Sequence, residues 1–183
     1  MMTPFVEELN FLLALGTIGM QIATVTLIAL LFLEKKNSDY AVLGNFVRRF
    51  GLHIGFLIAL GSTIMSLYYS EVLGFIPCFL CWLQRIFIYP LVVLFGIAIW
   101  KKDSRIADYV IGLSIVGFCI ALYQHFLQMM GHGSLPCPSS GGDCAQRILF
   151  EFGYITFPLI AVSSFALLIV LMLFVRRQNI ENQ

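Results

Sequence analysis

Charged side chains are scarce in this sequence. Only 11% of the 183 residues are Asp, Glu, Lys or Arg, whereas 60% are hydrophobic and the mean hydropathy is +0.91. A water-soluble chain of this length would leave too much apolar surface in contact with water, so the composition excludes an ordinary soluble domain. The sequence therefore predicts an integral membrane protein.

The chain also lacks an excess of basic residues. It carries 11 Lys and Arg against 10 Asp and Glu, for a formal net charge of +1 at neutral pH. The basic residues fall in short segments between apolar stretches and at the C-terminus. Because nucleic-acid binding depends on a concentrated positive surface, no nucleic-acid partner is expected.

No Lys or Arg precedes the first apolar run. A secretory signal peptide has a basic start and a short apolar core, whereas this segment begins with Glu7 and Glu8 and its apolar run is too long. We therefore expect a retained transmembrane helix with its N-terminus outside the cell.

Apolar stretches long enough to cross a bilayer occur five times. A hydrocarbon core about 30 Å thick needs roughly 20 helical residues at a rise of about 1.5 Å each. Backbone groups in lipid must bond internally, so each stretch is expected to be helical. The predicted spans are Phe11–Leu33, Leu52–Tyr69, Cys78–Trp100, Tyr109–Met130 and Phe152–Val175. The predicted fold class is an all-α integral membrane protein with no separate soluble domain.

Basic residues are unevenly divided between the two ends of these spans. One side receives nine of them, namely Lys35, Lys36, Arg48, Arg49, Lys101, Lys102, Arg105, Arg176 and Arg177. The other side receives only Arg85 and Arg147. Because basic loops stay in the cytoplasm, the first side and the C-terminus are predicted to be cytoplasmic, and the second side extracytoplasmic.

Cysteine is infrequent too, but four of the five cysteines form two pairs on the predicted outer side. Cys78 and Cys81 are separated by two residues at the mouth of the third span. Cys137 and Cys144 are separated by six residues in the only other outer loop, in a compartment where disulfides persist. A two-residue gap at a helix N-terminus is typical of redox-active thiols. The fifth, Cys119, is predicted to be a buried apolar side chain.

Two other interpretations of the four cysteines remain open. A four-thiolate zinc site usually has gaps of about 2 to 4 residues in each half, which the gap between Cys137 and Cys144 exceeds. Two structural disulfides in a non-catalytic membrane scaffold suit small extracytoplasmic segments. Arg85 favours a reactive pair, because it lies four residues after Cys81 on the same helical face, where a cation stabilises a thiolate. The alternative for Arg85 is an interfacial side chain that reaches toward water.

The position of the first pair also suggests where its electrons go. A dithiol at the mouth of a membrane helix must discharge two electrons, and a quinone is an apolar two-electron acceptor. His125, near the outer end of the fourth span, is a candidate donor to a quinone oxygen. A histidine in this position is equally compatible with a hydrogen bond inside the bundle.

Several runs of this sequence resemble one family. The run PCFLCWLQRIFIYPL, from Pro77 to Leu91, is similar to the signature of the disulfide bond formation protein B (DsbB) family, in the form found in Gram-positive bacteria. The resemblance continues through the residues Tyr123-Gln124-His125, the second cysteine loop and the run FGYITFPL. The family core has four helices, so residues 50–183 are expected to form that bundle. Residues 1–49 would add an N-terminal transmembrane helix and a cytoplasmic loop.

The resemblance implies an activity. Members of this family are thiol:quinone oxidoreductases that reoxidise an extracytoplasmic thioredoxin-like (DsbA-like) thiol oxidase and pass the electrons to a membrane quinone, ubiquinone or menaquinone. By this resemblance Arg85 holds a quinone carbonyl, with His125 nearby, and no metal is involved.

The resemblance also divides the work among the cysteines. Cys81 is implied to be the sulfur that contacts the quinone, with Cys78 as its partner. Cys137 is implied to exchange with the partner oxidase, and Cys144 with Cys78, so that the two loops are connected.

Overall fold

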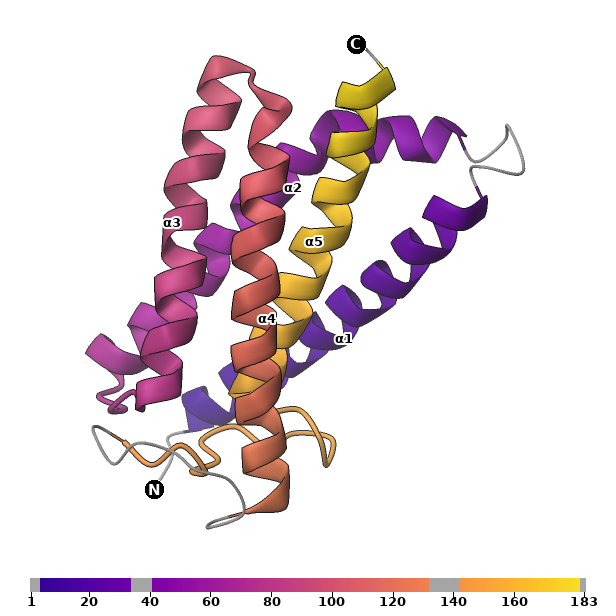
Figure 1. Cartoon of the computed structure of the whole chain (residues 1–183). Coiled ribbons are helices and arrows are strands. Elements are labelled where there is room, and N and C mark those ends of the chain that lie inside the picture. The colour runs from indigo at the N-terminus through magenta and orange to yellow at the C-terminus, as the bar shows by residue number, and fades with distance from the viewer. Residues whose placement is uncertain (1–3, 34–40, 132–141, 182–183) are drawn as a thin grey trace.

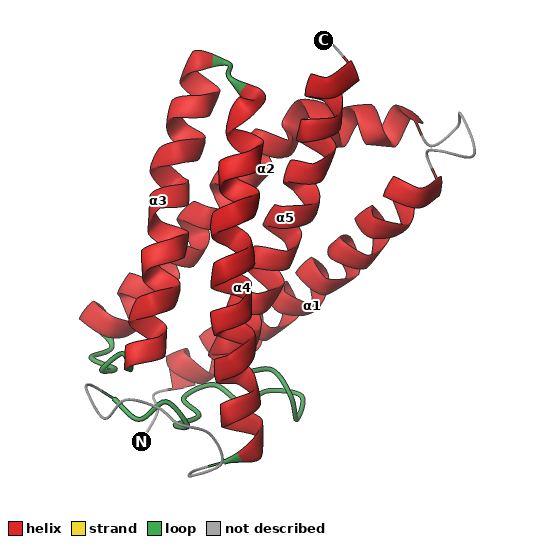
Figure 2. Cartoon of the chain, viewed as in Figure 1, coloured by secondary structure: helices red, strands yellow, loops and turns green. Residues whose placement is uncertain are grey.

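Five long helices make up the described part of the protein. The computed structural model describes residues 4–33, 41–131 and 142–181. The helices are α1 (Pro4–Leu33), α2 (Ala41–Leu67), α3 (Phe79–Lys101), α4 (Ala107–Met130) and α5 (Phe157–Glu181). A π-helical turn, Tyr68–Val72, extends α2, and the short 3₁₀ helix Ser104–Ile106 leads into α4. Figure 2 shows helices and loops but no strand over the described ranges, which confirms the predicted all-α class.

All five helices are long and apolar enough to cross a membrane. The start of α1, the start of α3 and the segment before α5 lie at one end of the bundle, and the C-terminal end of α5 lies at the other (Figure 1). The chain is thus a multi-pass membrane protein in which the described cysteine segments share one end.

Helix α5 forms the centre of the bundle and α1 its periphery. In the most apolar window of α5, 61% of the residues are buried, compared with 11% in α1. Helix α5 packs against α1, α2 and α4, and its Phe165 ring rests on Gly117 of α4 at a point where a larger residue would clash. Figure 1 shows α1 inclined to α3, α4 and α5. Much of α1 therefore faces lipid.

The helices differ most from the predicted spans at four of their ends. Helix α1 begins at Pro4 rather than Phe11, and α5 ends at Glu181 rather than Val175. Helix α2 begins at Ala41 rather than Leu52, because Arg48 and Arg49 extend the helix beyond its apolar part. Helix α5 begins at Phe157 rather than Phe152. The five residues 152–156, which come before the helix, begin with a tight turn in which Phe152 has φ 52° and Gly153 has φ 78°. Left-handed residues end any helix, and apolar composition alone did not reveal this turn.

Candidate active site

The first cysteine pair lies where α3 begins. Cys78 is the N-cap residue, and its sulfur accepts a hydrogen bond from the backbone N–H of Cys81 at 3.4 Å. An N-cap side chain normally satisfies such an N–H with an oxygen, and here a sulfur does so. The two sulfurs are 2.8 Å apart, and both cysteines are free thiols. The first turn of α3 therefore holds the two sulfurs within hydrogen-bonding distance of each other.

The two thiols of this pair have different surroundings. The hydrogen bond with Cys81, followed by burial, raises the pKa of Cys78 well above the usual range of a thiol. Cys78 is 3% exposed and packs with Cys144, whereas Cys81 lines a cavity between the helices. Cys78 thus keeps the proton that the pair shares and faces the second cysteine loop, while Cys81 faces the cavity.

Gln124 of α4 contacts both sulfurs. Its side-chain Nε2 lies 3.1 Å from the Cys78 sulfur and 3.3 Å from the Cys81 sulfur. Its Oε1 accepts a hydrogen bond of 2.6 Å from Nε2 of Gln84, which fixes the orientation of the amide, and Gln124 is only 1% exposed. A fixed N–H donor beside a sulfur favours its anionic form. No role was predicted for Gln124 from the sequence, although a polar side chain in a membrane span is a signal of function.

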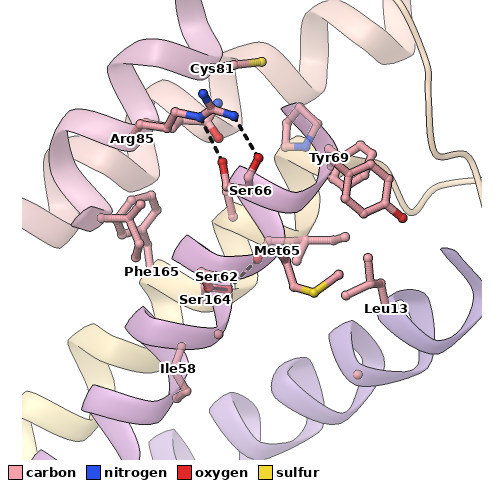
Figure 3. Close-up of a pocket in the computed structure, with 18 of the residues that line it drawn as sticks. Leu13, Ile58, Ser62, Met65, Ser66, Tyr69, Cys81, Arg85, Ser164 and Phe165 are labelled. Atoms are coloured by element: carbon pink, nitrogen blue, oxygen red, sulfur yellow. Dashed lines mark hydrogen bonds between the residues drawn. The ribbon is translucent and has the colours of Figure 1, made fainter. Parts of the chain in front are cut away.

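Arg85 lies one helical turn beyond Cys81 and is 7% exposed. Its Nε donates to the Ser66 hydroxyl and its Nη2 to the Ser66 carbonyl, each at 2.9 Å, as Figure 3 shows. The guanidinium also lies 5.0 Å from the centre of the Trp82 ring. These partners, from the described residues, include no carboxylate, so the positive charge is held in place without being neutralised.

Ser66 lies two residues before the π-helical turn Tyr68–Val72. Such turns shift the backbone hydrogen-bond register and are frequent at functional sites. Local sequence spacing did not predict the pairing of Arg85 with Ser66, because the two residues come from different helices.

A cavity of about 490 Å³ opens beside Cys81, and every one of the five helices contributes to its lining. Small-molecule sites commonly have volumes of about 300–1,000 Å³. Cys81, Arg85 and Ser66 lie toward one end in Figure 3, and Ile58 lies toward the other. Apart from a few serines, the lining away from the thiols is apolar. The cavity therefore has one polar, thiol-bearing end and a long apolar body.

His125 lies outside this lining. Its Nδ1 is 2.9 Å from the hydroxyl oxygen of Thr156, a fully buried residue just before α5. The histidine thus joins α4 to the segment that leads into α5. This contact agrees with the second role considered for His125, a hydrogen bond inside the bundle, rather than with a contact to quinone. The polar side chain that α4 directs into the cavity is the neighbouring Gln124.

The second cysteine loop packs on the first. Cys144 is disulfide-bonded, and Cys137 lies outside the described residues. Cys144 is 1% exposed and belongs to a buried cluster with Cys78, Leu80 and Leu127. Gly142 approaches the backbone carbonyl of Ile76 so closely that a larger residue would clash. The described part of this loop thus covers Cys78, and the Gly142 contact leaves little room between the two segments.

Two side chains hold the second loop in this position. Gln128 of α4 donates to the Gln146 carbonyl at 2.9 Å, and Arg147 donates to the Gln128 carbonyl at 2.8 Å. Arg147, which the sequence assigned only to the charge count, thereby fastens the loop to the end of α4.

The fold and the site together define a class of protein: a multi-pass membrane protein with a thiol pair between a cavity and a second, disulfide-bonded loop. The family described as Disulfide bond formation protein DsbB matches residues 48–175 of the sequence. The chain belongs to this family of disulfide bond formation proteins, and the resemblance predicted from the sequence is confirmed.

Relatives with similar names match most of the chain. Disulfide bond formation protein C of Bacillus subtilis is 38% identical over 132 residues, which are 71% of this chain and 95% of the relative. The SPbeta prophage-derived disulfide bond formation protein B of the same species is 40% identical over 124 residues, covering 68% and 83%. A probable disulfide formation protein of Chlamydia pneumoniae is 33% identical over 133 residues, covering 73% and 96%. No solved structure matches the chain.

Proposed function

We propose that this protein is a membrane thiol:quinone oxidoreductase that reoxidises an extracytoplasmic, thioredoxin-like thiol oxidase. The observation that carries the proposal is the cavity, which brings Cys81, Arg85 and Gln124 together at the polar end of a long apolar space. A bound quinone supplies an acceptor for two electrons and two protons. An apolar body with a few fixed polar groups is the kind of site that such a molecule needs.

The residues at the polar end suit the acceptor. Arg85 is anchored through Nε and Nη2, so its charge is held in one place beside the cavity, where it attracts a carbonyl oxygen. Gln124 presents an N–H to the sulfurs and stabilises a thiolate at Cys81. Menaquinone and ubiquinone both fit this description. His125 was predicted to lie near the quinone, but it does not line the cavity and its ring lies 2.9 Å from the Thr156 hydroxyl. We propose that the neighbouring Gln124 takes this position instead.

The two loops suit a thiol relay. We propose that the dithiol of the partner oxidase reduces the Cys137–Cys144 disulfide and is itself oxidised. The freed Cys144 then attacks Cys78 of a Cys78–Cys81 disulfide, which releases Cys81 as a thiolate. Attack by Cys137 on Cys144 restores the loop disulfide and leaves Cys78 as a thiol. The packing of Cys144 against Cys78 supports this order of exchange.

At the end of this sequence, Cys137 and Cys144 form a disulfide again, and Cys78 and Cys81 are thiols. Cys144 is disulfide-bonded, and Cys78 and Cys81 are free thiols. The raised pKa of Cys78 fits a sulfur that leaves the exchange protonated. From that state, the dithiol has two electrons and two protons to give to an acceptor in the cavity.

We also propose the orientation that the charge count predicts. The cysteine loops and the N-terminus would be extracytoplasmic, with the C-terminus in the cytoplasm, because nine basic residues lie on one side and two on the other. An impermeant thiol reagent applied to intact cells tests this orientation. We expect it to label Cys137 of the reduced protein from outside, and labelling only after permeabilisation would reverse the assignment.

The activity is tested with the purified protein in quinone-free vesicles. A reduced thioredoxin-like oxidase is added, and the reduction of ubiquinone or menaquinone is followed by absorbance. We expect turnover that stops in Cys81→Ser. If neither quinone is reduced and the cysteines do not change redox state, the protein is instead a scaffold with structural disulfides. Stoichiometric zinc in the protein would point to a metal site.

A further inference from the structure

Helix α1 lines the cavity although it lies outside the family match. The match begins at residue 48, and α1 ends at Leu33. Leu12, Gly16 and Met20 nevertheless line the cavity from α1. Their spacing of four residues keeps them on one face of the helix. The added helix thus directs a continuous face at the site.

Buried polar contacts fix α1 in this position. The Tyr69 hydroxyl donates to Asn10 Oδ1 at 2.5 Å, and the two residues are 5% and 3% exposed. Further along α1, the Gln21 amide donates to the Ser163 hydroxyl of α5 at 3.3 Å. Polar contacts between membrane helices favour one register over others, because an unpaired polar group in lipid is costly. Tyr69 itself lines the cavity, so α1 is docked directly at the site.

Two glycines from different helices leave space beside the cavity. Gly16 of α1 and Gly61 of α2 both line it, and a Cβ atom added to either would meet no atom within 4 Å. Gly117 is different, because the Phe165 ring fills the space beside it. Glycines in membrane helices usually allow close helix packing. Gly16 and Gly61 instead leave space that a ligand could occupy.

We propose that α1 completes a binding channel for the isoprenoid chain of the quinone, and that Gly16 sets how bulky a chain fits. This inference rests on the proposed function, in which the quinone ring lies beside Cys81 and Arg85. The apolar body runs along α2 from Ser66 to Leu57, nine residues or about 13 Å of helix. Helix α1 forms the side of the channel that the four-helix core lacks.

The first test fills the channel from α1. Gly16→Phe is compared with Gly19→Phe, since Gly19 lies on the same helix, also has open space around it and does not line the cavity. Binding of a quinone with a long isoprenoid chain and of a quinone without one is measured by quenching of protein tryptophan fluorescence. Gly61→Leu, which fills the channel from α2, provides a second variant if Gly16→Phe does not fold.

We expect Gly16→Phe to weaken binding of the long-chain quinone about tenfold or more, because a few methylene groups that lose their burial account for that factor. Binding of the chainless quinone should change less than about twofold, and Gly19→Phe should behave as the unchanged protein. Equal affinities for the long-chain quinone in Gly16→Phe and Gly19→Phe, with Gly61→Leu also unchanged, would overturn the inference.

A second readout needs no turnover. Gly16→Cys and Gly19→Cys are alkylated with a lipid-soluble maleimide in quinone-free vesicles, and each site is followed by mass spectrometry of its peptide. Long-chain quinone should protect position 16 and leave position 19 reactive. Protection at position 16 that is already complete without quinone would mean that a lipid acyl chain fills the channel, and the inference would be wrong.

The two proposals fail in different ways. Quinone reduction by the unchanged protein with no effect at position 16 in either test removes the role of α1 and keeps the proposed function. Protection of position 16 by long-chain quinone without any thiol-dependent reduction keeps the channel and removes the proposed activity. A protein that neither binds nor reduces quinone overturns both.

Discussion

The two ends of the cavity are built differently. At the polar end, Cys81, Gln124 and Arg85 are held by specific hydrogen bonds or by the first turn of a helix. In the apolar body, Gly16 and Gly61 face open space. The polar end comes from helices within the family match, whereas the apolar body also uses α1, which lies outside it. Fixed polar groups suit the reaction that the family shares, and adaptable apolar walls suit the choice of a particular membrane molecule.

Among the variants, those of the cysteines should have the largest effects on the reaction proposed for the polar end of the cavity. Cys81→Ser is expected to abolish quinone reduction, because it removes the sulfur that faces the cavity, while Cys137 still forms a mixed disulfide with the partner oxidase. Cys137→Ser should do the reverse and leave the Cys78–Cys81 pair able to react with quinone. Trapped disulfides are read on non-reducing gels. An undiminished mixed disulfide in Cys137→Ser would mean that the partner attacks elsewhere.

Arg85→Met should give the next largest effect. A hydrogen bond to a charged group contributes about 1.5–3 kcal/mol, so the apparent KM for quinone should rise roughly 10- to 150-fold. Arg85→Lys keeps the charge but loses the planar donors to Ser66, and should recover thiolate formation at Cys81 more fully than quinone binding. Quinone titrations and the rate of Cys81 alkylation measure the two effects. If both were unchanged in Arg85→Met, the arginine would be only an interfacial side chain.

The pH dependence of Cys78 alkylation tests how the hydrogen bond with Cys81 affects the pKa of Cys78. Its raised pKa means that the thiolate is scarce at pH values where an ordinary cysteine, with a pKa of about 8.5, is half ionised. The rate of Cys78 alkylation should therefore still rise with pH above that value. Because the Cys81 hydrogen bond is the main cause, Cys81→Ser should move the profile to lower pH. An identical profile in both proteins would remove this explanation.

Gln124→Leu should have the smallest effect of the four. It removes neutral hydrogen bonds, each worth about 0.5–1.5 kcal/mol, so alkylation of Cys81 at fixed pH should slow by about 2- to 10-fold. Gln84→Leu provides the matched control: it frees the Gln124 amide without removing it, and should slow the reaction less. The thermal stability of both variants separates loss of folding from loss of the donor. An alkylation rate unaffected by Gln124→Leu would leave the amide a purely structural group.

Local sequence patterns predicted most features that depend on one helix. The prediction that Cys119 is buried was wrong, because its side chain is exposed on the surface of α4. The five spans, the position of Cys78 and Cys81 at the start of α3, and Arg85 one turn further follow from hydropathy, spacing and a 3.6-residue period. The start of α5 could not be predicted from these patterns, because the residues around the turn at Phe152 and Gly153 are as apolar as the helix that follows.

The contacts between helices could not be predicted from the sequence. Gln124 meets the sulfurs, Ser66 meets Arg85 and Asn10 meets Tyr69 only because α1, α2, α3 and α4 pack together in one particular way. The spacing of residues along the chain does not indicate which side chains of different helices come into contact. His125 shows the same limit, since a difference of one position in α4 decides whether a side chain reaches the thiols or Thr156.

The cover over Cys78 has a consequence for side reactions. Soluble thiols such as glutathione react by direct collision with a sulfur, and the described part of the second loop leaves Cys78 only 3% exposed. Cys81 opens onto an apolar cavity, which a charged tripeptide does not enter readily. The second loop and the apolar cavity thus shield both sulfurs from the surrounding water. Glutathione and similar soluble thiols should therefore react only slowly with either sulfur.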